Sequence, residues 1–273
     1  MMLERLKYKN HMGEVIDFGR LGIFVSGNDL HDYSWTVTQK NNKISAFQRS
    51  VSTRTLPVII FCPTVVEGVA ARNRLMEVAE KDVLAKKPGQ IIIGDYYYKC
   101  YITESKKSKY LASRRKMEAK LTICSDMPYW VREDKHSFRK SGINDPGLGY
   151  PYDYAFDFTS SSKSTVLTNT DFTASNFRMI IYGPCTDPVV YVSGHTYGVD
   201  CAVETGEYIT IDSVSKKVTL TAVDGTITNV FNLRRRDSYV FEKIQSGANA
   251  VTWSGDFGVD IILLEERSEP KWT

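Results

Sequence analysis

A single strong helix signal lies in the N-terminal half of a chain that otherwise shows short strands and turns. Thr64 and Glu67 have the spacing of a capping box, in which each side chain accepts a backbone N–H of the other residue. Pro88 and Gly89 end the pattern, so we expect a helix over about 64–87. Apolar residues at helical spacing predict its buried side: Val65, Val69, Met76, Ala79 and Val83. One helix between candidate strands indicates a single α/β insertion in a mainly β protein.

A long hairpin is expected directly after the helix, over about 95–124. The segment Glu104–Lys109 is polar and is predicted to form its tip. The return strand alternates apolar and polar residues from Met117 to Ile123. The outgoing strand is aromatic, and its alternation places these residues on one face: Tyr96, Tyr98, Cys100 and Ile102. The other face then carries Tyr97, Lys99 and Tyr101.

Length and turn signals divide the chain into two domains. A chain of 273 residues is long enough for about two domains, each with its own core. We place the N-terminal domain at 1–134 and a linker at 135–159, where glycine and proline interrupt regular structure. Residues 160–273 show about eight short strand candidates, Tyr239–Ile244 among them, separated by turn signals. Such a series is typical of a β-sandwich.

Composition and motifs argue against several classes of function. A net charge of +3 and a pI of about 8.4 are too weak to indicate nucleic-acid binding. No run of about 18 apolar residues and no secretion signal are seen, so we expect no membrane partner and folding in a cytoplasm. Five cysteines without a CxxC and four isolated histidines predict no metal site. No phosphate loop, dinucleotide fingerprint or nucleophile motif occurs, so we expect no cofactor and no enzymatic activity.

Short motifs spread over almost the whole chain carry a family resemblance. They include Asn28-Asp29-Leu30, Ile93-Gly94-Asp95-Tyr96-Tyr97, Asp126-Met127-Pro128-Tyr129-Trp130, Gly206-Glu207-Tyr208 and Leu263-Leu264-Glu265-Glu266-Arg267. None of these motifs is catalytic, and their order along the chain is more specific than any one of them. In this order the chain resembles the distal tail proteins (Dit) of siphophages that infect Gram-positive bacteria.

The resemblance implies an architecture and a role. It implies an N-terminal domain with a β-sandwich, one helix and a long hairpin, followed by a galectin-like C-terminal β-sandwich. It also implies a homohexameric ring at the distal end of the tail tube, within the baseplate of a phage or prophage particle. The partners implied are further copies of the chain, the tail tube protein, the tail-tip hub and receptor-binding proteins. The protein would be assembled in the host cytoplasm and located in the virion, at the tail tip.

The aromatic strand is the candidate surface for contact between copies in such a ring. An exposed edge strand is a template for pairing with a neighbouring chain. We therefore expect the following residues at the ring interface: Tyr96, Tyr97, Tyr98, Lys99 and Tyr101. The alternative is that this hairpin only completes its own sheet.

A second hypothesis is a carbohydrate-binding module that recognises sugars of the host cell wall. A lectin face presents an exposed aromatic ring for stacking, flanked by polar side chains. The aromatic candidates are Tyr191, Tyr197 and Trp253, with His195 beside them. Their alternation with valine and cysteine indicates that some of them belong to the core instead. A wall hydrolase would need a pair of acidic residues at suitable spacing, which we do not find.

Overall fold

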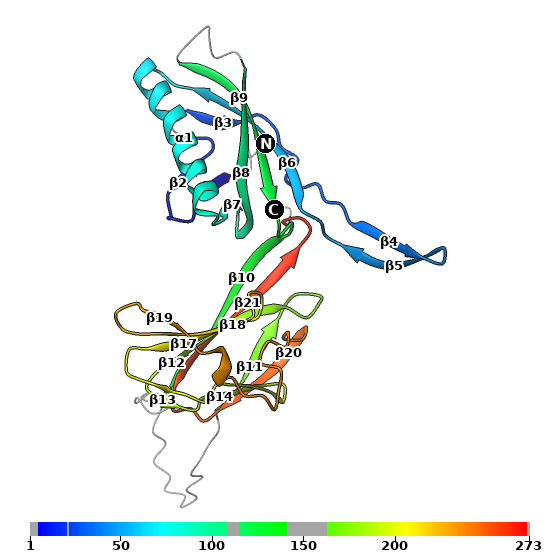
Figure 1. The fold of residues 1–273 in the computed structure, drawn as a ribbon, viewed down its shortest axis with the longest axis vertical. Helices are drawn as coiled ribbons and strands as arrows, with labels where there is room; N and C mark the ends of the chain where they lie inside the picture. Colours follow the sequence, from blue (N-terminus) through cyan, green and yellow to red (C-terminus); the bar gives the residue numbers. More distant parts are fainter. Residues whose placement is uncertain (1–4, 21, 109–114, 141–162, 272–273) are drawn as a thin grey trace, which may run out of the picture. The chain divides into compact units, whose positions relative to one another are not determined.

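The computed structural model describes residues 5–20, 22–108, 115–140 and 163–271. The chain divides into two compact units (Figure 1). Unit 1 comprises Met1–Arg132 together with Glu266–Thr273, and unit 2 comprises Glu133–Glu265. Strands dominate both units, and the described residues contain one α-helix, so the predicted mainly β fold with one helix is confirmed.

Unit 1 consists of short strands, a first hairpin, the helix and then the longest strands. Its elements are β1 Leu6–Lys9, β2 Val15–Asp17, β3 Ile23–Val25, β4 Thr36–Lys40, β5 Lys43–Gln48, β6 Ser52–Phe61, α1 Val65–Ala85, β7 Gly89–Ile93, β8 Tyr96–Ser108, β9 Lys116–Ser125 and the start of β10 Trp130–Phe138. The strands β8 and β9 form the hairpin expected at 95–124, and its predicted tip lies partly outside the described residues.

Two sheets of unit 1 meet in the long strand β8. One sheet has the order β10-β8-β7-β1-β2, and the other joins β3, β6, β9 and β8. The first part of β8, Tyr96–Cys100, pairs with β7, and the remainder pairs with β9. Apolar side chains from both sheets and from α1 form one core. Burial of apolar surface stabilises this core by about 25 cal/mol for each Å² removed from water. Alternation along β8 was predicted correctly, because Tyr96, Tyr98, Cys100 and Ile102 are all buried.

The helix α1 has the predicted ends but only part of the predicted buried side, since Ala79 is buried as expected. Thr64 and Glu67 form both hydrogen bonds of the capping box, and Lys86 ends the helix in the left-handed conformation with φ of 52°. The buried residues are Gly68, Ala71, Leu75, Val78, Ala79 and Asp82. Val65, Val69 and Val83 are exposed, so their assignment to the core was wrong. Small residues let the helix approach the sheet closely, and a hydrophobicity pattern does not register glycine or a buried aspartate.

We expect the cap to contribute measurably to the stability of unit 1. Replacing Thr64 by Ala removes the acceptor for the Glu67 N–H, which should lower the free energy of unfolding by about 1 kcal/mol. Thr64→Ser keeps the hydroxyl and should stay within about 0.5 kcal/mol of the parent. Urea denaturation of the three proteins measures the difference. Equal stabilities would show that the cap makes no net contribution.

Unit 2 is built from the second half of β10 and the strands that follow it. These elements are β11 Lys163–Asn169, β12 Asn176–Tyr182, β13 Cys185–Thr186, β14 Val189–Val192, β15 His195–Gly198, β16 Ala202–Val203, β17 Tyr208–Asp212, β18 Lys217–Thr221, β19 Ile227–Asn229, the 3-10 turn η1 Phe231–Leu233, β20 Gly247–Trp253 and β21 Gly258–Arg267. One sheet has the order β19-β18-β17-β12-β21-β10, and a second has the order β11-β20-β14-β15. Their inward side chains share one core, as in a β-sandwich.

One strand predicted for unit 2 is absent from the structure. Tyr239–Ile244 forms no strand and makes only an isolated bridge between Ser175 and Ile244. A turn forms there instead, in which the Glu242 N–H donates to the Tyr239 carbonyl. Val240, Phe241 and Ile244 are nevertheless buried, so this apolar run anchors a turn in the core.

The division into units differs from the predicted domain limits at two places. Glu133–Phe138 is the second half of β10 and belongs to unit 2, although part of it was expected to be linker. Glu266–Thr273 belongs to unit 1, although it was expected in the C-terminal domain. Most of the predicted linker, 141–159, lies outside the described residues.

Candidate interaction surfaces

The predicted interface residues of β8 divide between the core and the surface of unit 1. Tyr98 is 0% exposed and Tyr96 is 6% exposed, so neither side chain can reach a neighbouring copy. The Tyr98 ring lies 5.3 Å from the Trp130 ring, and the Arg54 guanidinium lies 5.0 Å from the Tyr98 ring centre. This corrects the prediction for Tyr96 and Tyr98. The remaining candidates are half-buried on the opposite face: Tyr97, Lys99 and Tyr101.

The expectation of an open edge along the aromatic stretch of β8 was also wrong. Tyr96–Cys100 pairs with β7 on one side, and Tyr96–Tyr98 pairs with β10 on the other. From Tyr101 onward the strand pairs with β9. Because backbone donors and acceptors are used within unit 1, this stretch offers no template for strand addition. This stretch of β8 therefore completes its own sheets, and the assignment of Tyr97, Lys99 and Tyr101 to a ring contact stays a prediction.

A different hairpin, formed by β4 and β5, presents an uncovered apolar face. Val37 lies opposite Phe47, and Gln39 lies opposite Ile44 after a bulge. The alternation puts Trp35 on the same face as Val37, and its ring meets the Phe47 ring edge-on at 6.5 Å. These four apolar residues are from 43% to 59% exposed. This hairpin was not predicted, although apolar residues lie on either side of Asn41-Asn42 in the sequence.

The base of the β4–β5 hairpin is fixed by Arg49. Its guanidinium lies 4.4 Å from the Trp35 ring centre and 5.4 Å from that of Tyr129, and it donates to the Ser268 hydroxyl at 3.1 Å. Burial lowers the pKa of Arg49, and the nearby Glu266 carboxylate opposes that shift. Cation–π contacts of this kind contribute about 0.5–2 kcal/mol. The base of the hairpin is thus held while its apolar face remains exposed.

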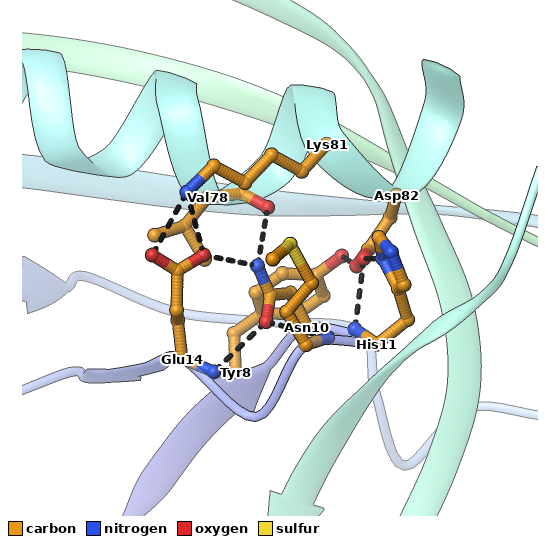
Figure 2. A network of polar contacts seen from close by, with 8 residues as sticks. Tyr8, Asn10, His11, Glu14, Val78, Lys81 and Asp82 are labelled. Atoms are coloured by element: carbon orange, nitrogen blue, oxygen red, sulfur yellow. Dashed lines mark hydrogen bonds and ion pairs between the residues drawn. The ribbon is translucent and has the colours of Figure 1, made fainter. Parts of the chain in front are cut away.

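A buried carboxylate ties the N-terminal strands to the helix (Figure 2). Asp82 on α1 is fully buried and accepts hydrogen bonds from the Tyr8 hydroxyl at 2.5 Å and from the His11 backbone at 2.9 Å. The His11 ring contacts the same carboxylate at 2.5 Å. Burial, and then the bond to Asp82, raises the pKa of Tyr8 far above its ordinary value. A Cβ at Gly89 would come within 2.3 Å of Asp82, so only glycine fits there.

An outer layer of polar contacts surrounds this carboxylate. Glu14 accepts from Lys81 at 2.8 Å and from the Asn10 amide at 2.7 Å (Figure 2). The Asn10 side-chain oxygen in turn accepts the backbone N–H groups of Met12 and Glu14. These contacts shape the turn between β1 and β2 and join it to α1. They are satisfied within unit 1, so this network is structural.

Beside this turn lies an apolar pocket of about 440 Å³. It is formed by β2, β3, the residues that follow β6 and the first half of α1, and its apolar lining includes Val15, Ile16, Ile23, Cys62, Ala70 and Ala71. Charged residues stand around it: Asp17, Arg20, Glu67 and Arg74. Gly22, at φ of 75°, lets the chain pass close to Cys62, whose sulfur would lie 2.3 Å from an added Cβ.

The three sugar-stacking candidates do not form a common surface. Tyr197 and Trp253 are 1% and 2% exposed. The Tyr197 hydroxyl donates to the Glu242 carbonyl and the Trp253 indole donates to the Phe257 carbonyl, so both polar groups are satisfied inside unit 2. This corrects their assignment as stacking residues. Tyr191 is 41% exposed, and His195 contacts the Tyr239 carbonyl at 2.9 Å.

Among the described residues, no group of three or more His, Cys, Asp or Glu side chains could hold a metal ion. All five cysteines are free. In the described part of the chain, no helix has both the length and the apolar character needed to span a membrane.

In unit 2, Asp260 provides a test of electrostatic stability. It accepts from Lys135 at 2.7 Å and from the Tyr182 hydroxyl at 2.8 Å. Burial alone would raise its pKa, but hydrogen bonds from Lys135, Ser137 and Tyr182 outweigh burial and hold the pKa below its ordinary value. Because the folded-state pKa is depressed, the stabilisation is present above the unfolded pKa of about 3.9 and is lost as pH falls through the folded value.

We therefore expect Asp260→Asn to lower the free energy of unfolding by about 1–3 kcal/mol at pH 7. The difference from the parent should shrink at acid pH, as the carboxyl of the folded parent takes up a proton. Urea titrations at pH 7 and at acid pH measure it, with the exposed Asp256→Asn as the matched control. A difference that does not change with pH would rule out the electrostatic explanation.

No family model matches the sequence, and no curated protein matches it. Solved structures do match its fold. A chain of the phage P2 baseplate in its activated conformation with calcium aligns with a TM-score of 0.65 at 14% identity, over 98% of this chain and 100% of that one. The phage p2 baseplate with strontium gives a TM-score of 0.64 at 14% identity, with the same coverage. The SPP1 Dit protein aligns with a TM-score of 0.59 at 8% identity, over 96% and 98%.

This chain has the fold of a phage distal tail protein. The structural match extends over both units and nearly the full length of each matched chain. The chains therefore share the fold of each unit and the order of the two units along the sequence. SPP1 Dit is described as a paradigm of the hub adsorption apparatus in phages that infect Gram-positive bacteria. At these identities the distal-tail fold is what the chains share.

Proposed function

We propose that this protein is a structural component of a siphophage or prophage tail, in which six copies form a ring. The ring would sit at the distal end of the tail tube and join the tube to the tail-tip hub of the baseplate. The supporting observation is the likeness to baseplate chains over 98% of this chain and 100% of the matched chain. Likeness of one domain alone would not support a role that depends on the whole architecture.

The same proposal includes the partners and the location. Further copies of the chain, the tail tube protein and the tail-tip hub are direct partners, and receptor-binding proteins attach at the same assembly. The protein is located in the virion at the tail tip, after assembly in the host cytoplasm. Its C-terminal sandwich is galectin-like, and its work is structural rather than enzymatic. Tyr97, Lys99 and Tyr101 remain candidate contact residues on the half-buried face of β8.

The structure favours this role over the carbohydrate-binding hypothesis. Two of the three stacking candidates are core residues with satisfied polar groups, which leaves Tyr191 without the other members of its proposed sugar face. Unit 1, by contrast, exposes a contiguous apolar face on the β4–β5 hairpin, and exposed apolar patches mark sites of protein association.

Cryo-electron microscopy of intact tail particles tests the proposal. We expect one ring with six copies of this fold at the end of the tail tube. Native mass measurement of the purified chain at high concentration provides a second readout and should show a hexamer. Particles that lack the protein, or that hold it as dimers or trimers, would refute the proposed function.

A further inference from the structure

A second pocket of unit 1, of about 310 Å³, lies at the base of the β4–β5 hairpin and is called the polar pocket below. Its lining comes from the segment before β4, the start of β6 and the C-terminal segment that returns to unit 1. More than half of the lining residues carry a hydroxyl group. The charged lining residues balance, with two of each sign: Asp29, Asp32, Arg49 and Arg54. The polar pocket therefore combines many hydroxyl groups with no net formal charge.

Two of these charged groups are held in place by the fold. Arg54 is 6% exposed, and its guanidinium lies over the Tyr98 ring. Its Nη1 donates to the backbone carbonyls of Asp29 and Leu30. The Asp29 carboxylate accepts the Thr55 backbone N–H at 3.1 Å. Groups that are fixed before binding lose little freedom when a ligand arrives, so this part of the polar pocket is preorganised.

Part of the Arg54 guanidinium is left for a ligand. A guanidinium has five N–H donors, and in the described part of the chain only Nη1 of Arg54 has acceptors. Neither Nε nor Nη2 is enclosed by protein atoms, so solvent reaches both nitrogens. Because Arg54 lines the polar pocket, a molecule bound there can accept hydrogen bonds from them. A buried cation with donors to spare at a pocket indicates a binding site.

We propose that the polar pocket binds a neutral saccharide of one or two sugar units. A ligand that suits this lining must donate to carboxylates and accept from guanidinium groups within one small volume, and sugar hydroxyls do both. An anion would meet Asp29 and Asp32, and a cation would meet Arg49 and Arg54, so the lining selects against both. Pockets for small molecules begin at about 300 Å³, which sets the small size of the ligand.

Tyr33 adds the apolar surface that a sugar ring needs. Its side chain belongs to the lining and is 57% exposed, so its ring is accessible to a bound molecule. A tyrosine presents an apolar ring together with a hydroxyl, which matches the C–H groups and the hydroxyls of a sugar. Pro128 contributes a second apolar surface to the same pocket. The polar pocket is separate from Tyr191, Tyr197 and Trp253, which belong to unit 2.

Titration of the purified full-length chain with sugars tests the ligand class. The probes are glucose, galactose, rhamnose and N-acetylglucosamine, followed by chemical-shift changes in NMR spectra. We expect at least one of them to bind with a Kd of about 0.1–10 mM, and its uronic acid and amino derivatives to bind at least tenfold more weakly. Binding of none of the four below about 10 mM would overturn the proposal, and so would tighter binding of a charged derivative. The result does not depend on the proposed ring, because binding is measured on the purified chain.

Substitutions of exposed residues test the location. Tyr33→Ala and Asp32→Ala change exposed lining residues, so the fold should persist while the Kd rises at least tenfold. Tyr191→Ala removes an exposed tyrosine of unit 2 and is the matched control, which should bind like the parent. Circular dichroism confirms that each variant is folded. Binding that survives both pocket substitutions, or that Tyr191→Ala removes, would place the sugar elsewhere and overturn the proposal.

Discussion

Tyr98→Asp should unfold unit 1 rather than weaken assembly alone. The Tyr98 ring is fully buried between Trp130 and Arg54, so the substitution removes an aromatic side chain from the core and places a carboxylate there. Loss of a buried aromatic ring costs about 3–5 kcal/mol, and an unpaired buried charge adds to that. Urea denaturation followed by circular dichroism should show a loss of about 4 kcal/mol or more.

Two matched variants make this expectation specific. Tyr97→Asp changes the next residue on the opposite, half-buried face of β8 and should cost much less stability. Tyr98→Phe removes a hydroxyl that is buried and has no hydrogen-bond partner among the described residues, so it should be neutral or stabilising. A fully folded Tyr98→Asp monomer that fails to assemble would place Tyr98 at an interface and contradict its position in the core.

Asp82→Ala should be the second strongly destabilising change. It leaves the Tyr8 hydroxyl and the His11 backbone N–H without their acceptor in the interior of unit 1. Each unsatisfied buried group costs about 1–3 kcal/mol, so we expect a loss of about 3 kcal/mol or more. Denaturant unfolding measures it, and Glu80→Ala on the exposed side of the same helix is the control.

A double-mutant cycle with Tyr8→Phe separates the contact from the cavity. If the bond between Tyr8 and Asp82 contributes, then Asp82→Ala should cost less in the Tyr8→Phe background, with a coupling of about 1–3 kcal/mol. Strictly additive losses would show that Asp82 acts through the His11 contacts alone.

Local signals in the sequence predicted the elements of unit 1 better than their burial. The capping box and the proline after the helix mark backbone hydrogen bonding, so the limits of α1 were correct. Most of the predicted buried side was wrong, because Gly68 and Asp82 pack against the sheet by shape and hydrogen bonding. Likewise, the alternation in β8 identified its two faces but could not show which face the rest of the chain would cover.

The candidate surfaces depended on long-range contacts that no local pattern contains. Tyr197 and Trp253 were predicted as surface aromatics, but both inner faces of the sandwich enclose them. The apolar pocket combines residues from β2 with residues from α1 and the turn before α1, which are far from β2 in sequence. Apolar residues on either side of a turn at Asn41 and Asn42 could have indicated the β4–β5 hairpin, but not its apolar face, because only the bulge puts Ile44 and Phe47 on the same side.

The division of the chain into units affects the order in which the protein can fold during synthesis. Unit 2 is inserted in the sequence of unit 1, because Glu266–Thr273 returns to the N-terminal unit. The Arg49–Ser268 hydrogen bond joins residues 219 positions apart, and it fixes the base of the β4–β5 hairpin. A ribosome must therefore translate all of unit 2 before this hairpin acquires its last support. Nascent chains would hold the hairpin less firmly than finished ones, so it reaches its final geometry only once each copy is complete.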